Sequence, residues 1–217
     1  MKRALHKYKH ALWLLYLPVY LIIFNLAENQ ITSQYWVSYT PLDDRIPFIE
    51  EFVIPYILWF PAIWSTGIFL LFFDPDAFKR YVWCIIIGYS ISLAVFFVFP
   101  NGQNLRPGSF RNTSVFTDMV QTLYNYDTNT NVLPSMHVIG ASALTFAVFD
   151  SGKLRKPWLC AASIVLTILI DLSTVFIKQH SILDVWAGLA VSVVVYVIVY
   201  IIIKKKQFKK AKMKAFA

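Results

Sequence analysis

Long runs of apolar residues alternate with short polar or proline-bearing segments along the chain. A helix needs about 20 apolar residues to cross the hydrocarbon core of a bilayer. Six runs approach that length, and we predict that each is a membrane-spanning helix: residues 11–27, 52–73, 82–100, 135–149, 158–178 and 182–203. The fourth run is the shortest. The pattern therefore predicts an all-α membrane protein, a six-transmembrane helical bundle.

The connecting segments are residues 28–51, 74–81, 101–134 and 150–157. Almost nothing joins the fifth and sixth runs, so we expect them to form a tight helical hairpin. Segment 28–51 places Tyr35, Trp36, Tyr39 and Phe48 among polar residues, a mixture typical of the membrane interface. We expect an amphipathic piece of this segment to lie along the membrane surface.

Composition supports a membrane bundle. Of 217 residues, 58% are hydrophobic and only 15% are charged, with a mean hydropathy of +0.56. Soluble domains are usually about 45–50% apolar and about 25% charged. The length leaves room for one compact unit, so we predict a single membrane domain over residues 1–217.

The net charge of +8 could suggest nucleic-acid binding, but the basic residues flank the apolar runs, which indicates topology instead. Sixteen of the 20 lysines and arginines lie in the N-terminus, in segments 74–81 and 150–157, and after residue 203. The other four are Arg45, Arg106, Arg111 and Lys178. The positive-inside rule then makes both termini cytoplasmic, which six spans allow. We therefore predict a multi-pass protein of the cell membrane with no nucleic-acid partner.

The two ends of the chain carry basic residues. The basic start would also suit a secretory signal peptide, but the first apolar run is long and Asn25-Leu26-Ala27 is a poor cleavage site, so we expect a retained anchor. The basic cytoplasmic tail, residues 204–217, is expected to determine topology, with binding of anionic lipid as the alternative.

The two cysteines, Cys84 and Cys160, both fall within apolar runs. A disulfide, a thiol nucleophile and a cysteine metal site are therefore not expected.

Four polar features fall on the outer side in this topology. They are Asn101–Pro107, Pro134–His137, Lys178–His180 and Asp184. Two of the four basic residues of the outer side, Arg106 and Lys178, lie in these features. Their convergence on one membrane face predicts a site for an anionic substrate.

His180 and Asp184 are four residues apart, a spacing that places both on one face of a helix. A carboxylate beside an imidazole selects its tautomer and stabilises its charged form. The other ring nitrogen could then act as a nucleophile or base. The alternative is a helix cap at the membrane interface with a satisfied salt bridge.

The segment Pro134-Ser135-Met136-His137 suits the start of a helix, because proline needs no N–H donor in the first turn. A helix N-terminus offers free amides to an anion, Ser135 adds a hydroxyl donor, and His137 could protonate a leaving oxygen. The alternative is an ordinary capped helix start.

Arg106 carries a guanidinium, the best bidentate partner for phosphate oxygens, and Lys178 could place its ammonium at the outer interface. Either residue could instead be merely solvated. Asp171 lies inside the fifth run and shares a helix face with Thr174 and Lys178. It could orient Lys178, pair with Arg106, or remain protonated in a structural role.

Together these side chains suit phosphoryl transfer, which needs a nucleophile, a proton donor and cations around the phosphate. Metal binding competes for the same residue types. Two histidines and two carboxylates could hold zinc, but among these site residues neither His-x-x-x-His nor Glu-x-x-His spacing occurs, so we expect no metal site.

The motifs resemble those of the type 2 phosphatidic acid phosphatase superfamily, whose signatures are Lys-x6-Arg-Pro, Pro-Ser-Gly-His and Ser-Arg-x5-His-x3-Asp. Arg106-Pro107 is similar to the first, Pro134–His137 to the second with methionine in place of glycine, and Ser173–Asp184 to the third. The resemblance covers about residues 50–203. The family lysine would fall at Phe99 and the family arginine at Thr174; Lys178 and Gln179 could supply the missing donors.

The resemblance implies residue roles. His180 would attack phosphorus and form a phosphohistidine, Asp184 would orient it, and His137 would protonate the leaving group. Arg106, Ser135 and Lys178 would hold the phosphate, without a metal or other cofactor.

Three functions are consistent with these roles. The first is a lipid-phosphate phosphatase, acting on a lipid phosphate or polyprenyl diphosphate at the extracytoplasmic face. The second is a phospholipid headgroup transferase, because the degenerate motifs are also similar to inositol phosphorylceramide synthases. The third is a catalytically silent transporter or scaffold.

Overall fold

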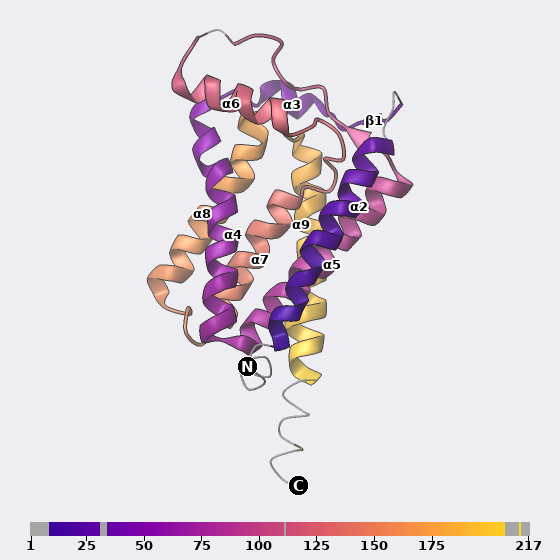
Figure 1. The fold of residues 1–217 in the computed structure, drawn as a ribbon. Helices are drawn as coiled ribbons and strands as arrows, with labels where there is room; N and C mark the ends of the chain where they lie inside the picture. Colours follow the sequence, from indigo (N-terminus) through magenta and orange to yellow (C-terminus); the bar gives the residue numbers. More distant parts are fainter. Residues whose placement is uncertain (1–8, 31–33, 111, 207–212, 214–217) are drawn as a thin grey trace.

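The computed structural model describes residues 9–30, 34–110, 112–206 and 213 (Figure 1). Within them the regular secondary structure is helical apart from two strands of two residues each. The elements in chain order are η1 (Lys9–Leu15), α2 (Tyr16–Gln30), β1 (Trp36–Val37), α3 (Pro41–Arg45), η2 (Glu50–Phe52), α4 (Val53–Phe73), α5 (Pro75–Val98), β2 (Asn101–Gly102), α6 (Val115–Tyr126), α7 (Met136–Asp150), α8 (Pro157–Phe176), α9 (Ile182–Tyr196) and η3 (Val197–Ile203).

Among the described residues, five helical segments are long and apolar enough to cross a membrane. They are Lys9–Asn29, Glu50–Phe73, Pro75–Val98, Pro157–Phe176 and Ile182–Lys206. They correspond to five of the six predicted spans. The fourth corresponds to α7, whose 15 residues measure about 22 Å, less than the hydrocarbon thickness of about 30 Å. The all-helical prediction is confirmed, while the count of six spans stays a prediction.

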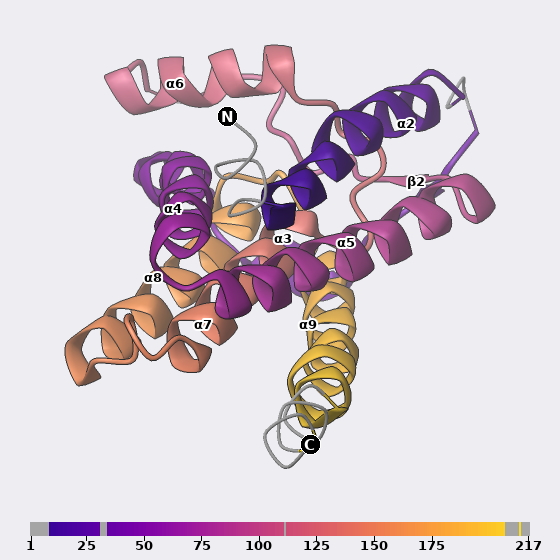
Figure 2. The ribbon, with the colours of Figure 1, turned by 60° about the horizontal axis from the view of Figure 1, so that its bottom comes forward.

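Helix α7 is the centre of the bundle and packs against α4, α5, α8 and α9 (Figures 1 and 2). Most of its side chains are buried, including a run of small residues, Gly140, Ala141, Ser142 and Ala143. Small side chains let neighbouring helices approach closely, which favours packing where water does not drive association. Helix α7 is therefore surrounded mainly by its neighbouring helices.

The predicted start of the third span differs from the structure. Helix α5 begins at Pro75 rather than at residue 82, with Asp74 accepting a hydrogen bond from the backbone N–H of Ala77 at 3.2 Å. The segment that contains Lys79 and Arg80 therefore forms the first turns of the helix. Arg80 is tolerated there because its Nε lies 2.6 Å from a carboxylate oxygen of Asp150.

The predicted hairpin of the last two helices is also wrong. Helices α8 and α9 pack mainly against α7 and contact each other little. Helix α8 ends at Phe176, and Lys178 follows with a left-handed φ of 54°. Lys178 therefore lies beyond the helix and does not share a helical face with Asp171 and Thr174.

Segment 101–134 contains an amphipathic helix that the sequence analysis missed. Helix α6 lies near α4 across one end of the bundle, which is called the outer end because it is predicted to face outward (Figures 1 and 2). Val120 is buried, and partly buried Phe116 and Leu123 pack with it against Phe52 and Tyr56. Beyond the end of α2, the α-helix found among the described residues of the predicted surface segment 28–51 is the five-residue α3. A 12-residue amphipathic helix has no long apolar run, so a search for spans passes over it.

At the end of the bundle opposite α6, hydrogen bonds link the ends of neighbouring helices. His10 donates to the carbonyl oxygen of Leu71 at 3.0 Å, and Ser151 donates to Asp74 at 2.7 Å. Lys204 donates to Asp150 at 2.6 Å. These contacts bring the basic segments within the described residues to one end of the bundle. Its cytoplasmic orientation stays a prediction.

Several basic residues that entered the charge count lie outside the described residues: Lys2, Arg3, Lys7, Arg111, Lys209, Lys210, Lys212 and Lys214.

Candidate active site

A two-stranded parallel sheet organises the outer end of the bundle. Strand β1 pairs with β2 in the register Trp36 with Asn101 and Val37 with Gly102. The backbone N–H of Ser38 extends the pairing by donating to Gly102 O at 2.7 Å. The sheet therefore joins the connector that follows α2 to the segment that carries Arg106.

His180 and Asp184 meet as predicted, although not on one helical face. Helix α9 begins at Ile182 with Ser181 as its N-cap, so His180 precedes the helix. His180 Nδ1 lies 3.3 Å from Asp184 Oδ2, and the same oxygen accepts from the backbone N–H of Ser181 at 2.9 Å. Asp184 is fully buried, and the capping box of α9 holds its carboxylate in place.

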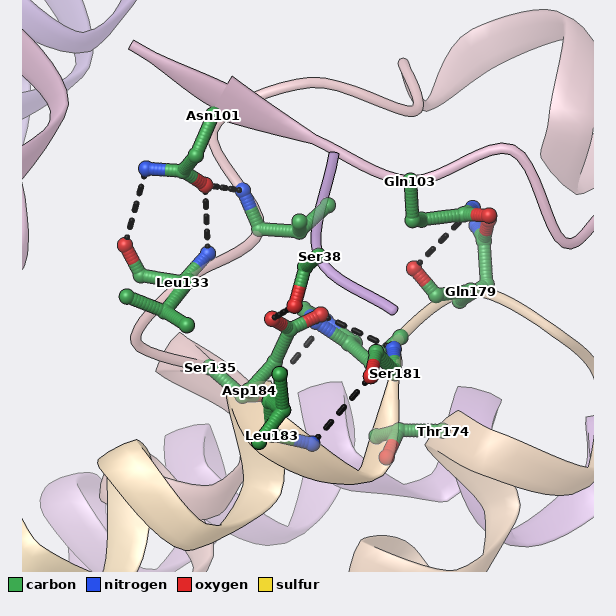
Figure 3. Close-up of polar contacts among 12 residues, drawn as sticks. Ser38, Asn101, Gln103, Leu133, Ser135, Thr174, Gln179, Ser181, Leu183 and Asp184 are labelled. Atoms are coloured by element: carbon green, nitrogen blue, oxygen red, sulfur yellow. Dashed lines mark hydrogen bonds and ion pairs between the residues drawn. The ribbon is translucent and has the colours of Figure 1, made fainter. Parts of the chain in front are cut away.

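Two further side chains support this pair, and the sequence analysis missed both. Ser38 Oγ donates to Asp184 Oδ1 at 2.5 Å (Figure 3). Asp43 accepts from Ser181 Oγ at 2.7 Å and from the backbone N–H of Ile182 at 2.8 Å. Both residues are buried although they lie in a connector that reads as polar surface. No spacing rule in the sequence marks them, because their partners are about 140 residues away.

Ser135 lies directly opposite the other nitrogen of His180. Its Oγ is 3.3 Å from His180 Nε2, and its backbone N–H donates to Asp184 O at 3.0 Å (Figure 3). Ser135 is fully buried and is the N-cap residue of α7 without a side-chain capping bond. Its hydroxyl therefore faces the histidine beside the free amides of the first turn of α7.

His137 lies in that first turn. Its ring is T-shaped to the ring of His180, with centroids 5.7 Å apart. Aromatic side chains of α4 hold it, with ring centroids at 4.4 Å for Tyr56 and 4.5 Å for Trp59. Trp59 also donates to the carbonyl oxygen of His137 at 3.0 Å. The structure thus brings both predicted histidines together.

Arg106 reaches the same region but binds protein groups. Its Nη2 donates to Asp127 O, Thr128 O and Gln179 Oε1 at 2.8, 2.6 and 2.5 Å. Its guanidinium carbon lies 4.4 Å from the ring centroid of Tyr124. The buried Nε has no hydrogen-bond partner among the described residues. Burial lowers the pKa of the guanidinium while Asp127 opposes that shift, and an arginine stays charged under both influences.

Lys178 is turned toward α3. Its Nζ donates to the carbonyl oxygens of Asp43 at 2.8 Å and Ile46 at 2.6 Å. Burial lowers the pKa of this ammonium, and the carboxylates of Asp43 and Asp44 oppose the shift. The described bonds of Lys178 are structural, and its role in phosphate binding stays a prediction.

Residues 102–208 match the family model of the PAP2 superfamily. The chain carries a PAP2 superfamily domain. No curated protein and no solved structure matches the chain. Members of the superfamily are typically metal-independent phosphatases, and membership suggests an enzyme of the lipid-phosphate phosphatase type that acts on phosphate-ester lipids. The long apolar helices suggest a multi-pass membrane protein.

The PAP2 domain begins at Gly102 and contains every predicted site residue. Helices α6 to α9 belong to it, whereas Ser38, Tyr56 and Trp59 reach the site from the preceding part of the chain. The wider core of residues 50–203 stays a prediction.

Two positions depart from the motif pattern of the PAP2 domain. The ring of Phe99 packs on Trp36, with centroids 5.4 Å apart, just before the matched region. Thr174 is buried, and its carbonyl oxygen accepts from the backbone N–H groups of Gln179 at 2.9 Å and His180 at 3.0 Å. Thr174 therefore helps to shape the turn that presents His180.

Asp171 does not pair with Arg106. No ion pair joins them, and Asp171 Oδ1 has no hydrogen-bond partner among the described residues. Within the same residues, no group of three or more His, Cys, Asp or Glu side chains is placed to hold a metal ion.

Proposed function

We propose that this protein is a lipid-phosphate phosphatase that acts through a phosphohistidine at the extracytoplasmic face of the membrane. The observation that carries the proposal is the alignment of Ser38, Asp184, His180 and Ser135. Hydrogen bonds and short contacts run from the Ser38 hydroxyl through the buried carboxylate and the imidazole to the Ser135 hydroxyl. His137 lies next to the end of this line.

The first half of the reaction forms a bond from His180 Nε2 to phosphorus and breaks the phosphorus–oxygen ester bond. Asp184 engages Nδ1, which directs the lone pair of Nε2 toward the substrate and stabilises the positive ring. The departing alkoxide takes a proton from His137. The products of this half are a lipid alcohol and a phosphohistidine.

In the second half, His137 removes a proton from water, the resulting oxygen bonds to phosphorus, and the phosphorus–nitrogen bond breaks. Phosphate leaves and His180 is regenerated. The free amides of α7 and the Ser135 hydroxyl would stabilise the equatorial oxygens. Arg106 Nε is a buried donor with no described partner and could add a further contact.

A headgroup transferase is the second candidate. The hydrogen bonds that Arg106 and Lys178 make to protein oxygens favour it. Arg106 and Lys178 already donate to protein oxygens, which leaves little positive charge for a phosphomonoester dianion. A phosphodiester carries a single negative charge and needs less compensation. In that reaction a lipid or sugar hydroxyl would replace water as the acceptor.

The test uses full-length protein purified in detergent, with phosphatidate and a polyprenyl diphosphate as separate substrates and EDTA present. We expect release of inorganic phosphate, its loss in His180→Ala, and an acid-labile phosphoenzyme in the parent protein only. His10→Gln, at the opposite end of the bundle, is the matched histidine control. Full activity of His180→Ala would refute the mechanism.

The same preparation separates the candidates. Exchange of headgroups between two phospholipids, without release of phosphate, would select the transferase. Neither release nor exchange over a broad lipid panel would favour the silent scaffold. Loss of activity in EDTA that added Mg²⁺ or Zn²⁺ restores would refute the metal-independent mechanism.

A further inference from the structure

Two buried amide side chains lie on one short segment above the catalytic residues. Asn101 belongs to β2 and Gln103 follows it, and neither side chain reaches solvent. Figure 3 draws Asn101 against Leu133 and Gln103 against Gln179. The roles proposed above for the site use neither residue, although each contacts a segment that ends in a catalytic histidine.

Asn101 holds the segment that leads to His137. Its Oδ1 accepts from the backbone N–H groups of Val132 at 2.9 Å and Leu133 at 2.8 Å. Its Nδ2 donates to Leu133 O at 3.1 Å, and its own carbonyl oxygen accepts from the N–H of Asn131 at 2.7 Å. Asn101 therefore fixes the position of the backbone that leads into Ser135.

Gln103 holds the segment that leads to His180. Its Nε2 donates to the carbonyl oxygens of Lys178 at 3.0 Å and Gln179 at 3.3 Å. Its Oε1 accepts from the N–H of Leu105 at 2.5 Å. Through the Gln103 side chain, the segment that follows β2 is therefore hydrogen-bonded to the turn that precedes His180.

We propose that Asn101 and Gln103 are positioning residues that fix the separation of the two catalytic histidines. Asn101 and Gln103 are two residues apart on one short segment, and they hydrogen-bond to the segments that lead to the two histidines. One rigid segment thereby sets the spacing of both histidine-bearing segments. The contact pattern carries this inference, and its catalytic consequence rests on the proposed function.

Buried amides suit this purpose because each presents a donor and an acceptor together. A buried amide or carbonyl that loses its partner costs about 1–3 kcal/mol, so the held segments cannot shift without a penalty. A carboxylate of the same shape keeps the acceptor, loses both donor hydrogens and faces the carbonyl oxygens with a like charge. Asn101→Asp and Gln103→Glu therefore loosen one segment each with little change in volume.

Controls with the same chemical change exist on the outer face of α6. Gln121 and Asn125 are exposed there and contact each other rather than the catalytic segments. Gln121→Glu and Asn125→Asp should leave kcat/KM within about twofold of the parent protein, since exposed substitutions rarely have larger effects.

Comparing kcat/KM for two substrates with different leaving groups distinguishes the two positioning roles. The ratio kcat/KM reports the steps up to departure of the alcohol, and a p-nitrophenolate leaves without a proton whereas an alkoxide needs one. Asn101→Asp displaces the proton donor, so we expect a loss of about 100-fold on phosphatidate and much less on p-nitrophenyl phosphate. Gln103→Glu displaces the nucleophile and should lower both by similar factors. Equal losses on both substrates in Asn101→Asp would overturn its assignment.

Amide hydrogen exchange of the full-length protein in detergent tests the contacts without any reference to activity. We expect faster exchange at 131–137 in Asn101→Asp and at 176–182 in Gln103→Glu, with the inner halves of α5 and α9 unchanged. Unchanged exchange in these two stretches would overturn the proposal. If the parent protein releases no phosphate, the proposed function fails and the exchange data still decide the positioning role. Asn101→Ser replaces Asn101→Asp in both assays should the latter not accumulate.

Discussion

Gly188 controls how closely α9 approaches the N-terminus of α7, and Gly188→Ala is the sharpest test of the site geometry. A Cβ at this position would lie 2.9 Å from Ser135 O, 2.9 Å from Val138 Cβ and 3.1 Å from Val138 Cγ1. Real Cβ atoms essentially never make contacts below 3.0 Å. Because one neighbour is backbone and the other a branched Cβ, the two helices must separate by a few tenths of an ångström.

The magnitude follows from two opposing terms. Alanine in a helix interior is favoured over glycine by about 1 kcal/mol, whereas overpacking costs about 1–3 kcal/mol. The net change in the free energy of unfolding is therefore a loss of about 0–2 kcal/mol. Activity should respond more strongly, because the separation acts on Ser135, which lies 3.3 Å from His180 Nε2. A misplacement of about 1 Å can cost about 100-fold, so a smaller shift predicts about a tenfold fall in kcat.

The assay compares phosphate release and the thermal midpoint in detergent for Gly188→Ala and a control, Gly152→Ala. A Cβ at Gly152 meets no atom within 4 Å. We expect kcat to fall about tenfold in Gly188→Ala only, with a small change in midpoint. A variant with parental kcat and a higher midpoint would refute the close-packing argument, because helix propensity alone would then govern the position.

Three further predictions address other contacts. Ser38→Ala removes a hydrogen bond to the charged Asp184, a loss of about 1.5–3 kcal/mol, so kcat should fall about 10- to 100-fold at unchanged KM while Ser38→Thr retains activity; an unchanged kcat would contradict this role. Lys178→Met leaves the carbonyl oxygens of Asp43 and Ile46 without this donor and should lower the thermal midpoint, whereas a raised KM at an unchanged midpoint would assign Lys178 to phosphate binding instead. Asp150→Asn weakens a buried ion cluster at the inner end and should destabilise by about 3 kcal/mol with unchanged kcat of the folded enzyme, and a catalytic defect without destabilisation would count against it.

Hydrophobic patterning was sufficient for the long helices because a membrane span is a local property. Residues 52–73 were predicted as a span and α4 runs from Val53 to Phe73, since about 20 consecutive apolar residues have few alternatives in a bilayer. Patterning failed where polar residues are neutralised by distant partners. Arg80 lies within α5 because Asp150 pairs with it, and no local rule contains that information.

The candidate reactive residues were also predictable from the sequence, because they lie in short motifs. His137, His180, Asp184 and Ser135 were predicted together and the structure brings them within one site. The two cations were predicted with less success. Arg106 and Lys178 are near, but their hydrogen bonds go mainly to backbone oxygens, and the orientation of a long side chain depends on every neighbour it meets.

The sequence by itself determined the helical architecture with its long apolar helices, the position of the basic segments along the chain and the identity of the candidate reactive side chains. Only the tertiary structure decided what holds those side chains in place. Ser38, Asn101 and Gln103 act on partners about 30 to 146 residues away through buried hydrogen bonds. Such bonds depend on atomic distances across packed segments, and those distances arise only when the helices and the small outer sheet assemble.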